Sequence, residues 1–188
     1  MGGHSVVAAA ALRHETFASM VLIDPTIFPV DRYGQPPLDA SFIARRRNVW
    51  ASPGTMFESF RSRAPFVHWN PAVLKDYCDF GLLPRGDEFV LACPPEIERS
   101  IYGHSTEKES NLHPVIPSLS QPVVVMRGGI PWSKGVFNLN ASPTDPALAS
   151  HFPVGKDVLL EGRSHYIPME TPELVAEYVI KAPTQAAP

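Results

Sequence analysis

The stretch Lys156-Asp-Val-Leu-Leu-Glu-Gly-Arg-Ser-His-Tyr-Ile-Pro-Met-Glu-Thr-Pro-Glu173 holds the pattern on which the fold assignment depends. It begins with a short apolar run that ends at glycine, which is typical of a strand. Thr171, Pro172 and Glu173 then supply an N-cap, a proline at the first helical position and an acidic residue near the positive end of the helix dipole. A strand followed by a loop and a capped helix is the repeating unit of an α/β protein.

Two further apolar runs have the same strand character. Ser19-Met-Val-Leu-Ile-Asp24 is closed by Pro25, and Gln121-Pro-Val-Val-Val-Met-Arg-Gly128 ends at glycine. Continuous apolar runs of this length suit strands that are buried on both faces of a parallel sheet. We therefore predict an α/β fold with a right-handed parallel sheet. Residues 1–14 are small, apolar and free of proline, so a buried helix is predicted to run from residue 1.

The segment between the first two strands has a different composition, with prolines every few residues. Its helical patterns lie near residues 39–50, 70–80 and 95–102. We predict that residues 28–120 form a mainly helical cap, or lid, inserted into an α/β core. The core is predicted to comprise residues 1–27 and 121–181, with another helix near 146–151, and residues 182–188 are predicted to be a loose tail.

The composition excludes several classes of protein. The 188 residues are 44% hydrophobic and 19% charged, which is typical of a globular domain with a packed core. The formal net charge of −3 offers no basic surface to nucleic acid, and no apolar run is long enough to span a membrane. Two cysteines, Cys78 and Cys93, are too few for a disulfide framework. We therefore expect a soluble cytoplasmic protein without nucleic-acid or membrane partners.

Two side chains with catalytic chemistry follow predicted strands. His165 lies in the loop after the run that starts at Lys156, and Asp24 ends the run that starts at Ser19. The carboxyl ends of parallel strands are where α/β sheets place working groups, and a carboxylate there can orient an imidazole. The alternatives are a surface histidine and a turn-forming Asp-Pro. As a pair at matching strand ends, the two residues favour a catalytic interpretation.

An acid and a base of this kind need a nucleophile ahead of them in the chain. Ser5 in Gly3-His-Ser-Val-Val7 resembles the G-x-S-x-G motif, but valine replaces the last glycine and only four residues precede the serine. In the alternative register, Met1-Gly-Gly3 ends a Gly-His-Ser-Met-Gly-Gly sequence and the nucleophile is the residue before Met1. That register gives the following helix about 13 residues, which is near the usual length, so we favour it and keep Ser5 as the second candidate.

Several motifs together resemble the α/β-hydrolase superfamily: Met1-Gly-Gly3, Leu22-Ile-Asp-Pro25, Ala44-Arg-Arg-Arg47, Trp69-Asn-Pro71, Tyr77, Gly81-Leu82, Cys93-Pro-Pro-Glu96 and Glu161-Gly-Arg-Ser-His-Tyr-Ile-Pro-Met-Glu170. The chain is most similar to the fungal branch that holds the AK-toxin biosynthesis hydrolases and the peroxisomal acyl-CoA hydrolase of mycophenolic acid biosynthesis. The resemblance runs from residue 1 to about 181. It implies a serine-type hydrolase of ester or acyl-CoA thioester bonds that needs no cofactor, with His165 as general base and Asp24 as the triad acid.

The same resemblance implies that this is the C-terminal portion of the fold. The first five strands, one oxyanion donor and, in the favoured register, the nucleophile would lie ahead of residue 1. The second oxyanion donor, the backbone nitrogen after the nucleophile, would be that of Met1. We therefore expect a truncated chain that is inactive alone and self-associates through an exposed sheet edge. Peroxisomal members end in a Ser-Lys-Leu-like tripeptide, whereas this chain ends in Gln-Ala-Ala-Pro188.

Weaker signals concern the substrate. Aromatic residues that suit either an acyl pocket or ordinary packing are Trp50, Phe57, Phe66, Trp69 and Trp132, of which the three tryptophans are our candidates for substrate binding. Arg45 to Arg47 suit either the phosphates of coenzyme A or a solvated helix face. The seven histidines lack H-x-x-x-H and H-E-x-x-H spacing, so we expect no metal site.

Three hypotheses about function remain. The first is a serine-type ester or thioester hydrolase with a substrate-selecting cap. The second is a non-catalytic α/β-hydrolase-like remnant, or a pseudoenzyme that binds a small ligand. The third has an aspartate nucleophile, as in epoxide hydrolases and haloalkane dehalogenases, although Met-Gly-Gly follows a serine more often.

Overall fold

The computed structural model describes residues 1–37, 39–133 and 138–182, and it divides the chain into two compact units. The larger unit contains residues 1–36, 106–168 and the chain from Pro172 onward. The smaller unit contains residues 37–105 together with Met169–Thr171. Residues 28–36 and 106–120, which the sequence analysis placed in the cap, thus cluster with the larger unit.

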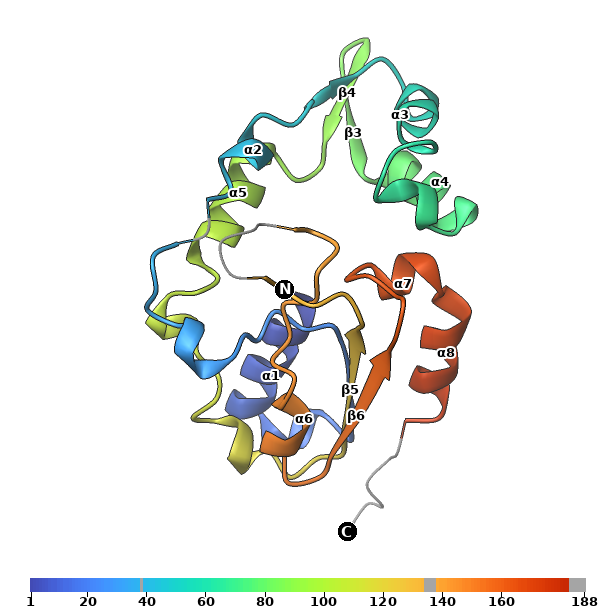
Figure 1. Cartoon of the computed structure of the whole chain (residues 1–188). Coiled ribbons are helices and arrows are strands. Elements are labelled where there is room, and N and C mark those ends of the chain that lie inside the picture. The colour runs from blue at the N-terminus through green and yellow to red at the C-terminus, as the bar shows by residue number, and fades with distance from the viewer. Residues whose placement is uncertain (38, 134–137, 183–188) are drawn as a thin grey trace. The chain divides into compact units, whose positions relative to one another are not determined.

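A parallel sheet forms the centre of the larger unit (Figure 1). Within the described residues its strands are β1 (Met20–Ile23), β5 (Val123–Gly128) and β6 (Gly155–Leu160), in the order β1-β5-β6. Ile23 pairs with Met126, and Met126 pairs with Val158, so the carboxyl ends of the strands meet at one edge. This observation confirms the predicted α/β class and parallel sheet.

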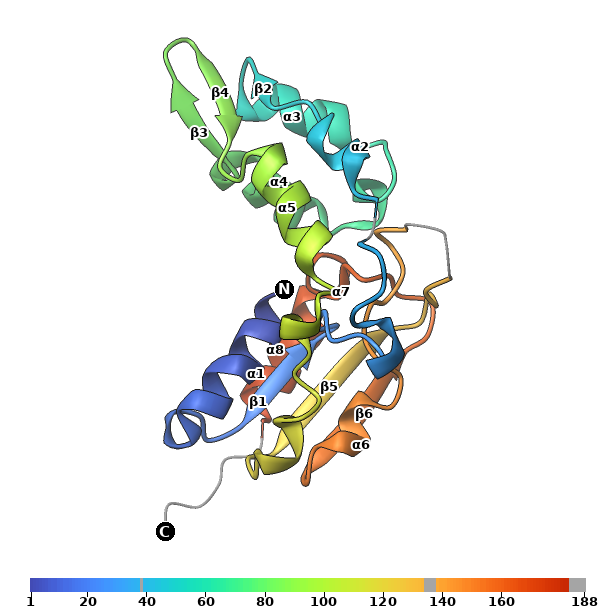
Figure 2. The same cartoon turned by 90° about the vertical axis from the view of Figure 1, so that its left-hand side faces the viewer.

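Helices cover both faces of this sheet, as the two views show (Figures 1 and 2). Val123 and Val125 of β5 pack with α1 (Gly2–Leu12) and α6 (Leu148–His151), whereas Val124 and Met126 pack with α8 (Pro172–Ile180). Side chains alternate between the faces of a strand, so an all-apolar run is what a strand covered on both sides requires. The helix predicted from residue 1 begins at Gly2, and the helix predicted after Thr171 begins at Pro172.

Short helices occupy the connections of the larger unit. The 3₁₀ helices are η1 (His14–Thr16), η2 (Val30–Arg32), η4 (Lys108–Ser110) and η5 (Ile116–Ser118), and the loop after β6 leads into the α-helix α7 (Ile167–Glu170). Ile27, Ile116 and Leu119 from these connections are fully buried in the same apolar cluster as α1. The connections on either side of the smaller unit are therefore part of the core of the larger one.

The smaller unit is mainly helical. Its helices are α2 (Ser41–Ala44), α3 (Pro53–Phe60), η3 (Phe66–His68), α4 (Pro71–Phe80) and α5 (Pro95–His104). Prolines open three of them because the first helical residues need no backbone donor. The side chains of Ser52 and Asn70 accept hydrogen bonds from the next turn of α3 and α4 as N-caps.

A small antiparallel sheet in the smaller unit corrects part of the sequence analysis. It consists of β2 (Val49–Trp50), β4 (Glu88–Leu91) and β3 (Leu82–Arg85) in the described residues. The helix predicted over residues 39–50 is thus wrong at its end, where tertiary pairing of Val49 with Val90 overrides the local pattern. The hairpin turn at Gly86, which has a positive φ of 60°, was not recognised.

Among the described residues, no helix is both long and apolar enough to cross a membrane. Residues 183–188 of the predicted loose tail lie outside the described residues.

Candidate active site

Asp24 occupies the end of β1 in an unusual backbone conformation. Its φ is +42°, a region that few residues other than glycine, asparagine and aspartate adopt, and Pro25 follows it. The residue is 1% exposed. A buried carboxylate is stable only with partners, so its contacts decide what it does.

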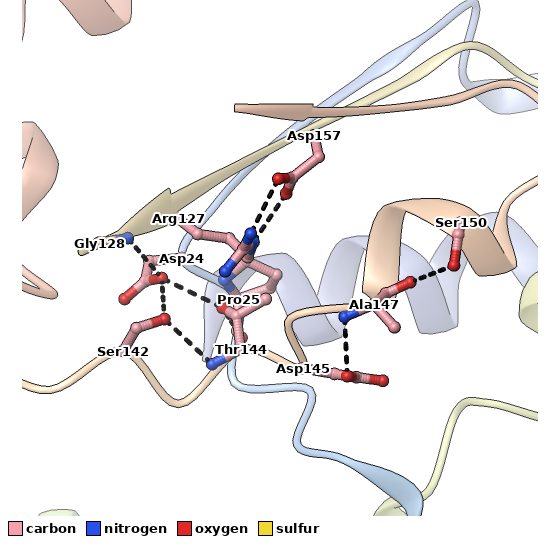
Figure 3. A network of polar contacts seen from close by, with 10 residues as sticks. All are labelled: Asp24, Pro25, Arg127, Gly128, Ser142, Thr144, Asp145, Ala147, Ser150 and Asp157. Atoms are coloured by element: carbon pink, nitrogen blue, oxygen red, sulfur yellow. Dashed lines mark hydrogen bonds and ion pairs between the residues drawn. The ribbon is translucent and has the colours of Figure 1, made fainter. Parts of the chain in front are cut away.

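The partners of Asp24 divide between its two oxygens. Oδ1 accepts hydrogen bonds from the backbone N–H of Gly128 at 3.0 Å, the hydroxyl of Ser142 at 2.6 Å and the hydroxyl of Thr144 at 3.2 Å (Figure 3). Oδ2 lies 2.7 Å from Nδ1 of His165. Three donors therefore fix one oxygen and orient the other toward a single imidazole.

Two glycines allow the loop that carries His165 to approach the end of β5. A Cβ on Gly128 would lie 2.8 Å from the carbonyl oxygen of Ser164, and a Cβ on Gly129 would lie 2.8 Å from Cα of Glu161. The N–H of Gly129 donates to the carbonyl of Arg163 at 2.9 Å. The backbone N–H of His165 donates to the backbone carbonyl of Asn140 at 2.8 Å. Backbone contacts on both sides thus position the imidazole.

The contact with Asp24 orients the imidazole of His165. An ionised carboxylate can only accept, so Nδ1 of His165 donates to Asp24 and the lone pair resides on Nε2. The His165 side chain is 28% exposed while that of Asp24 is fully buried. The imidazole of His165 is therefore accessible from outside, whereas the carboxylate that it contacts is not.

The start of α1 lies beside this pair. The Met1 amino group donates to the hydroxyl of Thr26 at 3.0 Å, and a Cβ on Gly3 would come within 2.7 Å of Cβ of Pro25. Burial lowers the pKa of the Met1 amino group, and the negative charge of Asp24 opposes this shift. The first helical turn thus packs directly on the Asp24-Pro25 turn.

Ser5, the second candidate for the nucleophile, lies one turn inside α1. Its backbone N–H donates to the carbonyl of Met1 at 3.1 Å, and its side chain is exposed. Within the described residues, no hydrogen bond joins Ser5 to His165. A nucleophile elbow places its serine at the turn before the helix, which is not the position of Ser5.

The three candidate tryptophans occupy different environments. Trp50 and Trp69 are 2% and 7% exposed and belong to an aromatic cluster of the smaller unit with Phe60, Phe66 and Tyr77. Packing accounts for these two. Trp132 lies in the larger unit and lines a cavity of about 420 Å³ together with Gly128, Ser142 and Thr144.

The Arg45 to Arg47 run is largely occupied by internal contacts. Arg46 pairs with Glu98 and donates to the hydroxyl of Tyr77 at 3.3 Å. Arg47 stacks on Trp50 with its guanidinium 4.0 Å from the ring centre. Arg45 and Arg47 are both exposed, and Arg47 is already engaged with Trp50.

The sequence analysis missed the supporting residues Ser142 and Thr144. They lie in Ala141-Ser-Pro-Thr-Asp145, a stretch without strand or helix periodicity, so only tertiary structure brings them to Asp24. It also did not foresee that His113, Asp145 and His151 would come together, each offering a ligand atom within 4.8 Å of the others. Local spacing motifs do not detect this group, because His113 lies far from Asp145 and His151 in the chain.

Comparison with solved structures identifies the class of fold. A peroxisomal α/β-hydrolase from Saccharomyces cerevisiae matches 99% of this chain with a TM-score of 0.69 and 17% identity. E-2-(acetamidomethylene)succinate hydrolase matches 95% with a TM-score of 0.66 and 20% identity, and the thioesterase domain of the curacin biosynthetic pathway matches 95% with 0.63 and 13%. No protein-family model and no curated protein matches the sequence.

The chain therefore has the α/β-hydrolase fold. It spans 54%, 62% and 63% of the lengths of these three structures. At such identities the likeness shows the fold alone. The similarity to the fungal AK-toxin and mycophenolic acid branch stays a prediction.

Proposed function

We propose that the chain provides the acid and base of a serine-type hydrolase that cleaves carboxylic ester or acyl thioester bonds. His165 would take the proton of the attacking hydroxyl and return it to the leaving group, and Asp24 would hold the imidazole in the required tautomer. The observation that carries the proposal is the 2.7 Å contact between a fully buried carboxylate and an accessible imidazole. No metal or organic cofactor is needed for acylation of a serine and its hydrolysis.

The nucleophile would be the residue immediately before Met1. Helix α1 begins at Gly2, and the first turn packs on Pro25 next to Asp24, which is where the turn from a strand to the nucleophile helix belongs. The backbone nitrogen of Met1 would then serve as an oxyanion donor. Ser5 points to solvent one turn later and is the weaker candidate.

The substrate would be an acyl compound. Trp132 is the candidate that best suits an acyl pocket, because it lines a cavity that also reaches the groups supporting Asp24. Arg32 lies over its ring, with the guanidinium carbon 4.3 Å from the ring centre. Trp50 and Trp69 would contribute by shaping the smaller unit rather than by touching the acyl chain.

Hydrolysis of p-nitrophenyl esters and acyl-CoA thioesters tests the proposal. We would compare residues 1–188 with a longer polypeptide that includes the residues encoded in frame ahead of Met1. Turnover is expected only in the longer polypeptide, and His165→Ala should abolish it while Ser5→Ala leaves it intact. Turnover by residues 1–188 that Ser5→Ala removes would show that Ser5 is the nucleophile, and turnover insensitive to His165→Ala would overturn the proposal.

A non-catalytic protein that binds a small ligand is the second candidate. The cavity of about 420 Å³ beside Trp132 favours it, because its size suits a small apolar molecule. Binding of acyl compounds by residues 1–188 that Trp132→Ala weakens, together with no turnover in the longer polypeptide, would support this alternative.

We also propose that the chain associates with itself through β1. In the described residues β1 pairs only with β5, so its other edge presents unpaired backbone groups. Light scattering after gel filtration should show a dimer or larger species that becomes monomeric when Val21 on this edge is replaced by lysine. A monodisperse monomer at all concentrations would contradict the proposal.

A further inference from the structure

Three side chains from distant parts of the larger unit meet at a second site. His113 lies between η4 and η5, Asp145 lies in the loop before α6, and His151 is the last residue of α6. Each offers one ligand atom, and these atoms all lie within 4.8 Å of one another. Nε2 of His151 is 3.3 Å from Oδ2 of Asp145, and Nε2 of His113 is 3.9 Å from the same oxygen.

Hydrogen bonds fix the orientation of the Asp145 carboxylate. Its Oδ1 accepts a hydrogen bond from the N–H of Ala147 at 2.9 Å (Figure 3). Its backbone N–H donates to the carbonyl of Ile27 at 2.8 Å. One oxygen and the main chain are thus fixed, and Oδ2 is directed at two imidazoles. The side chains of Asp145 and His113 are only 10% and 9% exposed, whereas that of His151 is 39% exposed.

Within the described residues, hydrogen bonds join only two of the three side chains to each other. Only the contact of His151 with Asp145 is within hydrogen-bond range, and Nε2 of His113 instead lies 2.8 Å from the carbonyl oxygen of Phe28. A tetrahedral zinc ion with bonds of roughly 2.0–2.2 Å separates its ligand atoms by about 3.3–3.6 Å. The 3.3 Å separation of Oδ2 from Nε2 of His151 agrees with these values, and the 3.9 Å separation from Nε2 of His113 is a few tenths of an ångström longer.

We propose that His113, Asp145 and His151 bind one divalent transition-metal ion, with zinc as the first choice. Two imidazole nitrogens and a carboxylate oxygen are a donor set that zinc prefers, and water would complete the coordination on the exposed side of His151. Nε2 of His113, which donates to the carbonyl of Phe28, binds the ion once its proton has moved to Nδ1 and that hydrogen bond has been given up. The aromatic edge of Tyr33, with its ring centre 6.2 Å from that of His113, limits movement of the imidazole.

The position of the site indicates a structural ion. Asp145 follows Thr144, whose single hydroxyl proton is shared between the carbonyl of Pro25, at 2.7 Å, and Oδ1 of Asp24, at 3.2 Å. An ion that joins Asp145 and His151 to His113 ties the segment that follows Thr144 to the connection between η4 and η5. The ion therefore stabilises the support of Asp24 and takes no part in the proposed hydrolysis.

Metal titration of residues 1–188 tests this inference. The chain is stripped with a chelator, its monodisperse fraction is collected, and zinc chloride is added in a calorimeter. Cobalt(II) replaces zinc in a parallel titration, because its visible absorption reports tetrahedral nitrogen and oxygen ligands. We expect one ion per chain, and we expect zinc to raise the melting temperature because it binds only the folded state.

Two variants and a matched control assign the ligands. His151→Ala removes a partly exposed ligand with little risk to folding, and Asp145→Asn removes the charge. Each should weaken zinc binding by at least about 100-fold and abolish the rise in melting temperature, whereas His14→Ala, at an exposed histidine of the same unit, should change neither. Failure of the parent chain to bind one ion per chain, or parent-like binding by both variants, would overturn the proposal. These measurements require no hydrolysis, so they stand apart from the proposed function.

Discussion

Asp24 and Asp145 are two buried carboxylates of the same unit that face histidines, and they are held in different ways. Three donors converge on Oδ1 of Asp24, and a single imidazole contacts Oδ2 at 2.7 Å. Asp145 has one backbone donor on Oδ1, and two imidazoles share Oδ2 at 3.3 and 3.9 Å. Both oxygens of Asp24 are therefore occupied by close hydrogen-bond donors. Oδ2 of Asp145 has its two imidazole neighbours at longer distances, which suits the proposed ion.

One residue type can thus serve two purposes. A carboxylate whose one oxygen accepts several hydrogen bonds is held in place, so its other oxygen can orient one imidazole. A carboxylate oxygen that has few hydrogen-bond donors and lies next to two imidazoles can bind a cation instead. The two sites are linked, because Thr144 donates to Asp24 and is the neighbour of Asp145 in the chain.

The largest expected effect comes from Asp24→Asn in the catalytically competent polypeptide. Asparagine tolerates the positive φ, so the backbone is retained while the charge is lost. We expect kcat to fall by about 10³- to 10⁴-fold, the size of effect known for loss of a triad carboxylate. Steady-state kinetics of the purified variant measure this.

Asp145→Asn sharpens the comparison. It should lower kcat by less than about tenfold, because no hydrogen bond of its side chain reaches His165 in the described residues. Asp87→Asn, at an exposed residue of the hairpin turn, serves as the control. Equal losses from Asp24→Asn and Asp145→Asn would show that the two carboxylates do not have separate roles.

Gly3→Ala should give the next largest effect. An alanine Cβ would lie 2.7 Å from Cβ of Pro25, so either α1 or the turn after Asp24 must move. Overpacking of this kind costs about 1–3 kcal/mol of unfolding free energy. Urea denaturation measures the loss.

Gly2→Ala is the matched control in the same helical turn. Nothing lies within 4 Å of a Cβ at that position, so alanine should be neutral or stabilising by up to about 1 kcal/mol through helix propensity. Similar losses in both variants would refute the close approach of α1 to the Asp24-Pro25 turn.

The sequence predicted the parts of this architecture that depend on local patterns. The apolar runs that became β1, β5 and β6 are long enough to define a parallel sheet, and proline and threonine marked the start of α8. The contact of Asp24 with His165 followed from the rule that strand ends meet at one edge of such a sheet.

Other features depend on tertiary contacts that no local pattern records. Ser142 and Thr144 reach Asp24 from an irregular loop, and β2 exists only because Val49 pairs with Val90. The group formed by His113, Asp145 and His151 likewise escapes a search by spacing, because a fold and not a motif brings these residues together. Polar residues in irregular loops are therefore where the sequence analysis fell short.

Ser142→Ala tests how far the orientation of Asp24 depends on one donor. The hydroxyl of Ser142 makes the shortest of the three bonds to Oδ1, at 2.6 Å. A hydrogen bond to a charged group contributes about 1.5–3 kcal/mol of free energy. Because two other donors to Oδ1 remain, we expect a loss at the low end of this range, which is roughly a tenfold fall in kcat with little change in KM.

Ser142→Thr should restore most of the lost activity, since it returns a hydroxyl to the same position. Ser150→Ala, at an exposed serine whose hydroxyl donates to Ala147, should leave kcat unchanged. An equal loss in Ser142→Ala and Ser142→Thr would indicate a packing effect in place of a lost donor.

The smallest effect is expected at the ion pair of Arg127 and Asp157, which is more exposed than either buried carboxylate. Two bonds of 2.7 and 2.8 Å join the guanidinium to the carboxylate, and Asp157 raises the pKa of Arg127. A raised pKa favours the charged form in the folded state, so this contribution is fully present at neutral pH and is lost only as the pH rises through the pKa of Arg127.

Solvent screening keeps the contribution of this pair small, because the Asp157 side chain is 39% exposed. We expect Arg127→Met to lower the free energy of unfolding by about 0.5–1 kcal/mol, and added salt should reduce the difference. Arg85→Met is the control, since Arg85 lies 3.7 Å from Glu88 and both side chains are more than half exposed. A loss at Arg127 that exceeds the loss from Gly3→Ala would contradict the small contribution expected of a partly exposed ion pair.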